Sequence, residues 1–169
     1  MRLSTLFVLA VPVFAAQAPA PVQDAFAPLR FLLGEWQGED GKGAPGTPSR
    51  GEFSLREELG GKVLVRRNFA EYPAQAGRAA FRHDDLMTIF TEGGQLKALY
   101  TDNEGHVIHY AITQAAEDEG AVFLSEGPGS RFRMTFLRKR ADLVTIKFEI
   151  AQPGKDFATY VEANARKKR

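Results

Sequence analysis

Ten short segments with alternating apolar and polar residues follow one another from position 35 to the C-terminal region. Side chains alternate between the two faces of a β-strand, so such a segment has one face to bury and one to expose. Gly, Pro, Asn or Asp residues, which favour turns, separate the segments. The segments lie at 35–40, 50–59, 62–71, 84–92, 95–102, 106–114, 121–126, 130–139, 143–151 and 156–164. The pattern predicts a meander of ten antiparallel strands.

Most of these segments are joined by short links, and the only long link is 41–49. A meander with one apolar face needs that face and its edges covered, and closing the sheet on itself does both. A β-sandwich, the rival architecture, requires longer crossing connections. We therefore predict an all-β fold, an antiparallel up-and-down barrel of about ten strands. A short N-terminal helix, capped by Asp24 and ending at Gly34, is expected before it.

The N-terminal region differs in composition from the rest of the chain. Arg2 precedes an apolar run from Leu3 to Phe14, and small residues follow, which is typical of a secretory signal peptide. The run is too short and too broken for a typical transmembrane helix of about 20 residues. We predict a signal peptide at 1–15, a Pro- and Ala-rich linker at 16–23 and a single barrel domain at 24–169. A periplasmic or secreted protein without an integral membrane segment after cleavage is expected.

Cysteine usage and charge limit the function classes further. The chain has no cysteine, so an exported form folds without disulfides, and 169 residues, 44% of them hydrophobic, suffice for a core. Five of the 22 basic residues are Arg2 and the terminal run 166–169, so the body has fewer bases than the 21 acidic residues of the chain. Such a body is a poor partner for a phosphate backbone, and nucleic acid binding is not expected.

Turn residues predict which side chains face inward. A turn at 103–105 pairs Tyr100 with Ile108 and Ala98 with Tyr110. Further predicted pairs are Leu124 with Phe132 and Val122 with Met134 across 127–129, and Phe132 with Ile150, Met134 with Phe148, Phe136 with Ile146 and Arg133 with Glu149 across 140–142. In the last segment two registers stay open, with either Phe157, Thr159 and Val161 or Ala158 and Tyr160 facing inward.

The sequence contains few residues in patterns that carry catalysis or bind metals. The G-x-G-x-x-G string at 41–46 holds Pro45 and precedes a strand, so it predicts a loop rather than a dinucleotide site. His106 and His109 fall on opposite faces of one segment, and no metal site is expected. Asp102 opposite His106 is the candidate acid–base couple, although an ion pair that stabilises the hairpin is the preferred interpretation.

The run FLLGEWQGE at 31–39 resembles the G-x-W opening of the calycins, which include lipocalins, fatty-acid-binding proteins and nitrobindins. It is most similar to that of bacterial exported lipocalin-like proteins. The resemblance implies a lipocalin-like barrel in which Trp36 begins the first strand and closes one end. It also implies that a basic residue of the last strand stacks on this ring, and Arg166 is the matching candidate.

Departures from the calycin pattern argue against the best-known ligands of that superfamily. Nitrobindins carry a glycine where Asp40 stands and bind haem through a C-terminal His, whereas no His follows His109. Haem is therefore not expected, and no other cofactor is indicated. The Arg-x-Tyr pair that fixes a carboxylate in fatty-acid-binding proteins is absent around Tyr160.

A barrel of this size is wide enough to hold one small ligand. The leading hypothesis is an exported lipocalin-like protein that binds a small apolar or amphipathic molecule inside the barrel. The candidate ligand-binding residues are Trp36, Tyr100, Tyr110, Phe132, Met134 and Phe136. Two alternatives are a calycin-type isomerase or cyclase that uses Asp102 and His106, and an envelope interaction module with a filled barrel.

Overall fold

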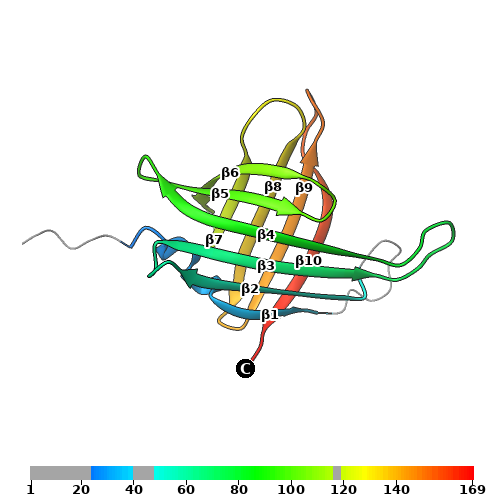
Figure 1. Cartoon of the computed structure of the whole chain (residues 1–169), viewed down its shortest axis with the longest axis horizontal. Helices are drawn as coiled ribbons and strands as arrows, with labels where there is room; N and C mark the ends of the chain where they lie inside the picture. The colour runs from blue at the N-terminus through cyan, green and yellow to red at the C-terminus, as the bar shows by residue number, and fades with distance from the viewer. Residues whose placement is uncertain (1–23, 40–47, 116–118) are drawn as a thin grey trace, which may run out of the picture.

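The chain forms a closed barrel of ten antiparallel strands in consecutive order, with β1 joined to β10 (Figure 1). The computed structural model describes residues 24–39, 48–115 and 119–169. The barrel predicted from the alternating segments is confirmed. The elements are the 3-10 helix η1 (Ala27–Leu32) and the strands β1 (Gly34–Gly38), β2 (Arg50–Glu58), β3 (Val63–Tyr72), β4 (Phe81–Glu92), β5 (Gln95–Asp102), β6 (Val107–Gln114), β7 (Gly120–Ser125), β8 (Arg131–Arg140), β9 (Leu143–Ala151) and β10 (Ala158–Lys167).

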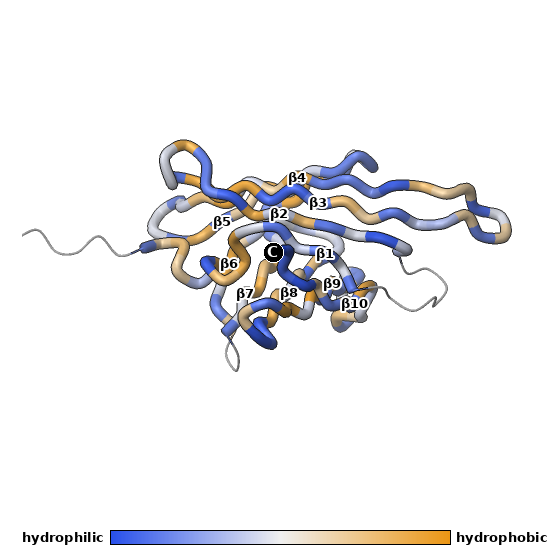
Figure 2. Tube along the Cα trace, turned by 90° about the horizontal axis from the view of Figure 1, so that it is seen from below, coloured by the Kyte–Doolittle hydropathy of each residue, from blue (hydrophilic) through white to orange (hydrophobic). Residues whose placement is uncertain are grey.

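The barrel is flattened into two layers whose strands cross. In Figure 1 the strands β1 to β6 run across the view in front of β7 to β10, and the hairpin of β3 and β4 projects beyond the rest. Figure 2 shows the layers from below, with hydrophobic and hydrophilic residues alternating along the strands. The predicted signal peptide and linker, Asp40 and the loop 41–46 lie outside the described residues. No helix among the described residues has the length and apolar character needed to cross a bilayer.

Two of the predicted hairpin registers are confirmed. Tyr100 pairs with Ile108 and Ala98 with Tyr110 between β5 and β6. Between β8 and β9 the four predicted pairs are present: Phe132 with Ile150, Arg133 with Glu149, Met134 with Phe148 and Phe136 with Ile146. Each turn places one face of its hairpin toward the interior, as the apolar alternation requires.

The register predicted for β7 and β8 is wrong by one residue. Phe123 pairs with Met134, and Leu124 pairs with Arg133. The connecting loop is one residue longer than predicted, and the Ser125 hydroxyl accepts the N–H of Phe132 at 2.8 Å across it. A shift of one residue exchanges the faces of a strand. Phe123 is therefore buried, and Leu124 is 42% exposed.

The last strand combines features of both open registers. A β-bulge lies between Thr159 and Val161, so Tyr160 is accommodated as an extra residue and is 69% exposed. Val161 is partly buried opposite Phe148, and Ala165 is fully buried. Beyond the bulge, the register with Val161 inward is therefore the one adopted.

Trp36 closes the end of the barrel at which the chain enters. Its ring is fully buried, stacks on Phe53 at 5.7 Å, and donates its indole N–H to the carbonyl oxygen of Leu32 at 2.8 Å. Gly34 has φ of +111°, and a Cβ there would meet the Lys167 side chain at 3.0 Å. The glycine and the tryptophan of the G-x-W run thus have separate steric roles at this end.

The basic residue above Trp36 is Lys167, which corrects the prediction of Arg166. The Lys167 Nζ lies 5.5 Å from the ring centroid. Ala165 faces the interior, so its neighbour Arg166 points outward, where its guanidinium binds Glu39 at 2.6 Å and Asp142 at 2.9 Å. The predicted cation–π contact is present, but one position further along the chain.

Candidate functional site

The two ends of the barrel interior differ in packing and polarity. At the η1 end most inward side chains are buried, and ring contacts run from Trp36 through Phe53, Phe136 and Phe123 to Tyr110. At the other end several inward side chains are only partly buried: Asn68, His83, Ile108, Phe132 and Phe148. The inner face of a closed barrel is reached from its ends, so this second end admits solvent. We call it the open half.

A buried ion pair forms the centre of the open half. Arg66 on β3 and Asp85 on β4 have side chains that are 7% and 4% exposed, and their Nη1 and Oδ1 atoms are 2.5 Å apart. The Arg66 guanidinium also lies 5.4 Å from the centroid of Phe53 and 5.9 Å from that of Phe136. Charges are rarely buried without a partner, and here each charge has one.

Two further side chains complete the shell around Asp85. Asn68 donates to its Oδ2 at 2.7 Å, and the Nε2 of His83 lies 3.5 Å from the same oxygen. Burial alone would raise the pKa of Asp85, but Arg66, His83 and Asn68 together hold it below its usual value. Asp85 therefore stays ionised inside the barrel.

His83 connects this ion pair to the rim of the barrel. Its Nδ1 lies 2.7 Å from Glu104 and its Nε2 lies 3.0 Å from the Tyr100 hydroxyl. Its hydrogen bond to Asp85 is the largest cause that raises the pKa of His83 to about 9, Glu104 adds to it, and partial burial opposes it. His83 is therefore protonated at neutral pH.

Tyr100, Asp102 and His106 extend the polar network along the rim. The Tyr100 hydroxyl donates to Asp102 at 3.1 Å, and the Nδ1 of His106 lies 2.8 Å from the same carboxylate oxygen. Burial opposes ionisation of Asp102, but hydrogen bonds from the backbone and ring of His106, among others, lower its pKa. Burial and the charges of Asp85 and Asp102 raise the pKa of Tyr100, which stays a neutral donor.

Two polar atoms of the interior have no hydrogen-bond partner among the described residues. They are the Nε of Arg66 and the hydroxyl of Tyr110, and both are shielded from solvent. Burial is the main cause that raises the pKa of Tyr110, so its hydroxyl keeps its proton. An unmet buried donor costs on the order of 1–3 kcal/mol, so such atoms call for a structural or functional reason.

The six predicted ligand-binding residues all face the interior, but they divide between the two ends. Trp36 and Phe136 belong to the packed core, with exposures of 0% and 1%. Tyr100 and Tyr110 meet in an edge-on contact at 6.4 Å beside the buried ion pair. Phe132 stacks on Phe148 at the open half, and the sixth residue, Met134, is 7% exposed. Of these six residues, only Phe132 is less than fully buried.

The predicted couple of Asp102 and His106 is in contact, as the distance of 2.8 Å given above shows. His106 is 58% exposed at the rim, whereas the Asp102 side chain is 2% exposed. The Asp102 Oδ1 also accepts the backbone N–H of His106 at 2.9 Å and of Glu104 at 3.0 Å, which fixes the β5–β6 turn. The contact between Asp102 and His106 therefore stabilises the β5–β6 hairpin.

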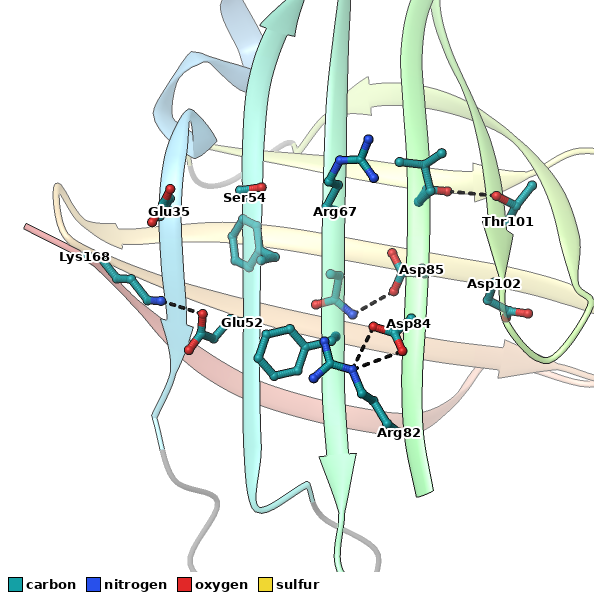
Figure 3. Close-up of a pocket in the computed structure, with 14 residues that line it drawn as sticks. Glu35, Glu52, Ser54, Arg67, Arg82, Asp84, Asp85, Thr101, Asp102 and Lys168 are labelled. Atoms are coloured by element: carbon teal, nitrogen blue, oxygen red, sulfur yellow. Dashed lines mark hydrogen bonds and ion pairs between the residues drawn. The ribbon is translucent and has the colours of Figure 1, made fainter. Parts of the chain in front are cut away.

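A groove of about 580 Å³ lies on the outer face of β1 to β5, and Asn68, Asp85 and Asp102 of the interior network are among the residues that line it (Figure 3). Its charged side chains largely neutralise one another: Lys168 binds Glu52 at 2.5 Å, and Arg82 binds Asp84 at 2.9 Å. The groove has neither the burial nor the unmet donors of the interior.

Sequence reasoning missed Arg66, Asn68, His83 and Asp85, which carry the interior network. The signal was present, because Arg66 and Asn68 share the inward parity of Leu64 on β3, and His83 and Asp85 share that of Met87 on β4. Charged residues at apolar positions of two adjacent strands indicate a buried pair. Among the described residues, no group of three or more His, Cys, Asp or Glu side chains is placed to hold a metal ion.

Comparisons with known proteins found neither a matching family model nor a matching curated protein.

Proposed function

We propose that this chain is a lipocalin-like protein that binds a small amphipathic molecule in the open half of the barrel. The observation that carries the proposal is that two unmet polar atoms, the Nε of Arg66 and the hydroxyl of Tyr110, lie at the boundary between the packed core and the partly buried apolar side chains of the open half. Ile108, Phe132 and Phe148 supply apolar surface, and burying such surface contributes about 25 cal/mol per Å². Tyr110 and Arg66 supply the polar contacts.

Binding is tested first by native mass spectrometry of the purified protein and then by titration with an environment-sensitive apolar fluorophore. We expect a co-purifying small molecule or saturable fluorophore binding with one site per chain. A linear, non-saturable response together with a bare protein mass would contradict the proposal.

Adjacent residues of β6 provide a matched pair of variants. Ile108→Glu places a charge on the inner wall, whereas Val107→Glu places the same charge on the outer face, where Val107 is 63% exposed. We expect Ile108→Glu to weaken fluorophore binding at least tenfold and Val107→Glu to leave it unchanged. Circular dichroism checks that the Ile108→Glu variant is folded. If it is not, Ile108→Ala, which adds no charge, replaces it and should weaken fluorophore binding by a smaller factor.

The site of action proposed for this protein is the periplasm or the extracellular space, after removal of residues 1–15. N-terminal sequencing of the protein isolated from its native host should then begin at Ala16. An uncleaved N-terminus in the cytosolic fraction would contradict this part of the proposal.

A second candidate function is acid–base catalysis of the isomerase or cyclase kind. The observation that favours it is the Tyr100 hydroxyl, which lies between His83 at 3.0 Å and Asp102 at 3.1 Å. A proton donor flanked by a base and an acid is an arrangement suited to proton transfer. Under this hypothesis Tyr100→Phe abolishes turnover of a bound carbonyl compound but keeps its binding. Under the binding hypothesis no turnover is detected with the wild type or with the Tyr100→Phe variant.

A further inference from the structure

The unmet polar atoms of the interior define what kind of head group a ligand would carry. The Nε of Arg66 is a donor and cannot accept, and the Tyr110 hydroxyl keeps a proton to donate. A ligand that satisfies both must therefore present hydrogen-bond acceptors. An alkylammonium head, which only donates, leaves the arginine unmet.

The cationic side chains around these atoms are already paired with carboxylates, so none is left to neutralise an anionic ligand. The Arg66 guanidinium is held by Asp85, and His83 is held by Asp85 and Glu104. Tyr110 packs edge-on against Tyr100, whose hydroxyl binds Asp102. Burial raises the pKa of Tyr110, the charge of Arg66 lowers it, and the charges of Asp85 and Asp102 raise it. A ligand carboxylate placed there would be a buried charge without a free cation and beside two like charges.

From this juxtaposition we infer that the barrel recognises an uncharged carbonyl head group, as in a ketone, ester or amide, through Tyr110 and Arg66. This inference rests on the proposed function and adds the ligand class to it. A carbonyl oxygen has two lone pairs, so it can accept from both donors without bringing a charge into the interior. The apolar chain of the ligand then lies against Ile108, Phe132 and Phe148 of the open half.

The inference is tested with four probes that share one alkyl chain and differ in the head group. The probes are a methyl ketone, a carboxylic acid, a primary amine and the plain alkane, and each displaces the fluorophore at pH 7. We expect the ketone to bind about fivefold or more tightly than the alkane, and the acid and the amine to bind more weakly than the ketone.

Tyr110→Phe supplies the matched variant, because it removes one hydroxyl and keeps the ring contacts with Tyr100 and Phe123. We expect the advantage of the ketone over the alkane to fall about fivefold, with alkane binding unchanged. Tyr160→Phe removes a hydroxyl at an exposed position and should change nothing.

The outcomes separate this inference from the function on which it rests. Tightest binding of the carboxylic acid or of the amine, equal binding of the four probes, or a ketone advantage that survives in Tyr110→Phe would each overturn the head-group inference alone. Failure of all four probes to displace a saturably bound fluorophore would overturn the head-group inference alone, whereas the absence of saturable fluorophore binding would overturn the proposed binding function as well.

Discussion

The closed end and the open half of this barrel are built from the same alternating strands, yet they differ in how their inward side chains are packed and in how polar these side chains are. At the closed end, η1 and Trp36 cover an aromatic core in which Phe136 is 1% exposed. At the open half, Phe132, four residues away on the same strand, is partly exposed on the side of the barrel that holds a buried ion pair. The closed end has what a barrel needs for stability, whereas the open half keeps polar groups that a purely structural core would replace with apolar ones.

The largest expected effect concerns the polar network of the open half. Asp85→Ala leaves Arg66 buried without its partner and removes contacts of Asn68 and His83, so unfolding should require about 4–5 kcal/mol less free energy. Asp84→Ala, on the outer face of the same strand, should change it by about 0.5 kcal/mol or less. Urea denaturation measures both. Equal effects of the two variants would show that the interior pair has no special role.

The next effect compares two phenylalanines of β8. Phe136→Ala in the closed end should cost about 4 kcal/mol of unfolding free energy, because it opens a cavity in a packed core. Phe132→Ala in the open half should cost less than half of that, because the site already meets solvent. Equal costs in chemical denaturation would mean that the two ends are packed alike.

Raising the pH should lower the free energy of unfolding by an amount on the order of 2 kcal/mol. The pKa of His83 is raised to about 9 in the folded chain, so its contribution is fully present below about pH 6.5 and is lost as the pH rises toward 9. The wild type should therefore lose this stability between pH 6 and pH 10, whereas His83→Gln should not. His109→Gln, which alters an exposed histidine of β6, serves as the control and should keep the alkaline loss.

The smallest expected effect on the free energy of unfolding concerns the basic residue above Trp36 at the closed end. Lys167→Ala removes the cation above Trp36 and should cost about 0.5–1 kcal/mol. Arg166→Ala removes exposed ion pairs with Glu39 and Asp142 and should cost less, about 0.5 kcal/mol at most. The emission of Trp36 should shift in the Lys167 variant only. A shift in the Arg166 variant instead would restore the original prediction for that residue.

The sequence was sufficient for the barrel, because alternation and turn residues act locally along each strand. It failed where one residue decides the face of a strand. The loop between β7 and β8 holds two glycines that allow several lengths, so Phe123 was assigned to the wrong face. The same one-residue uncertainty exchanged Arg166 and Lys167. Arg66 occupies an inward-facing position of β3, as Leu64 does, so alternation along the strand predicts that it is buried. That Asp85 is its partner follows only from the register between β3 and β4.

The absence of cysteine allows one direct test of the difference between the two ends, because a single introduced thiol is a unique label. Ile108 and Ile112 lie on the inner face of β6, the first partly buried in the open half and the second 7% exposed toward the closed end. In the native protein, a small thiol reagent should modify Ile108→Cys quickly and Ile112→Cys slowly, and the methyl ketone probe should protect the first. Equal rates for the two thiols, or no protection by a saturating probe, would contradict an open, ligand-binding half.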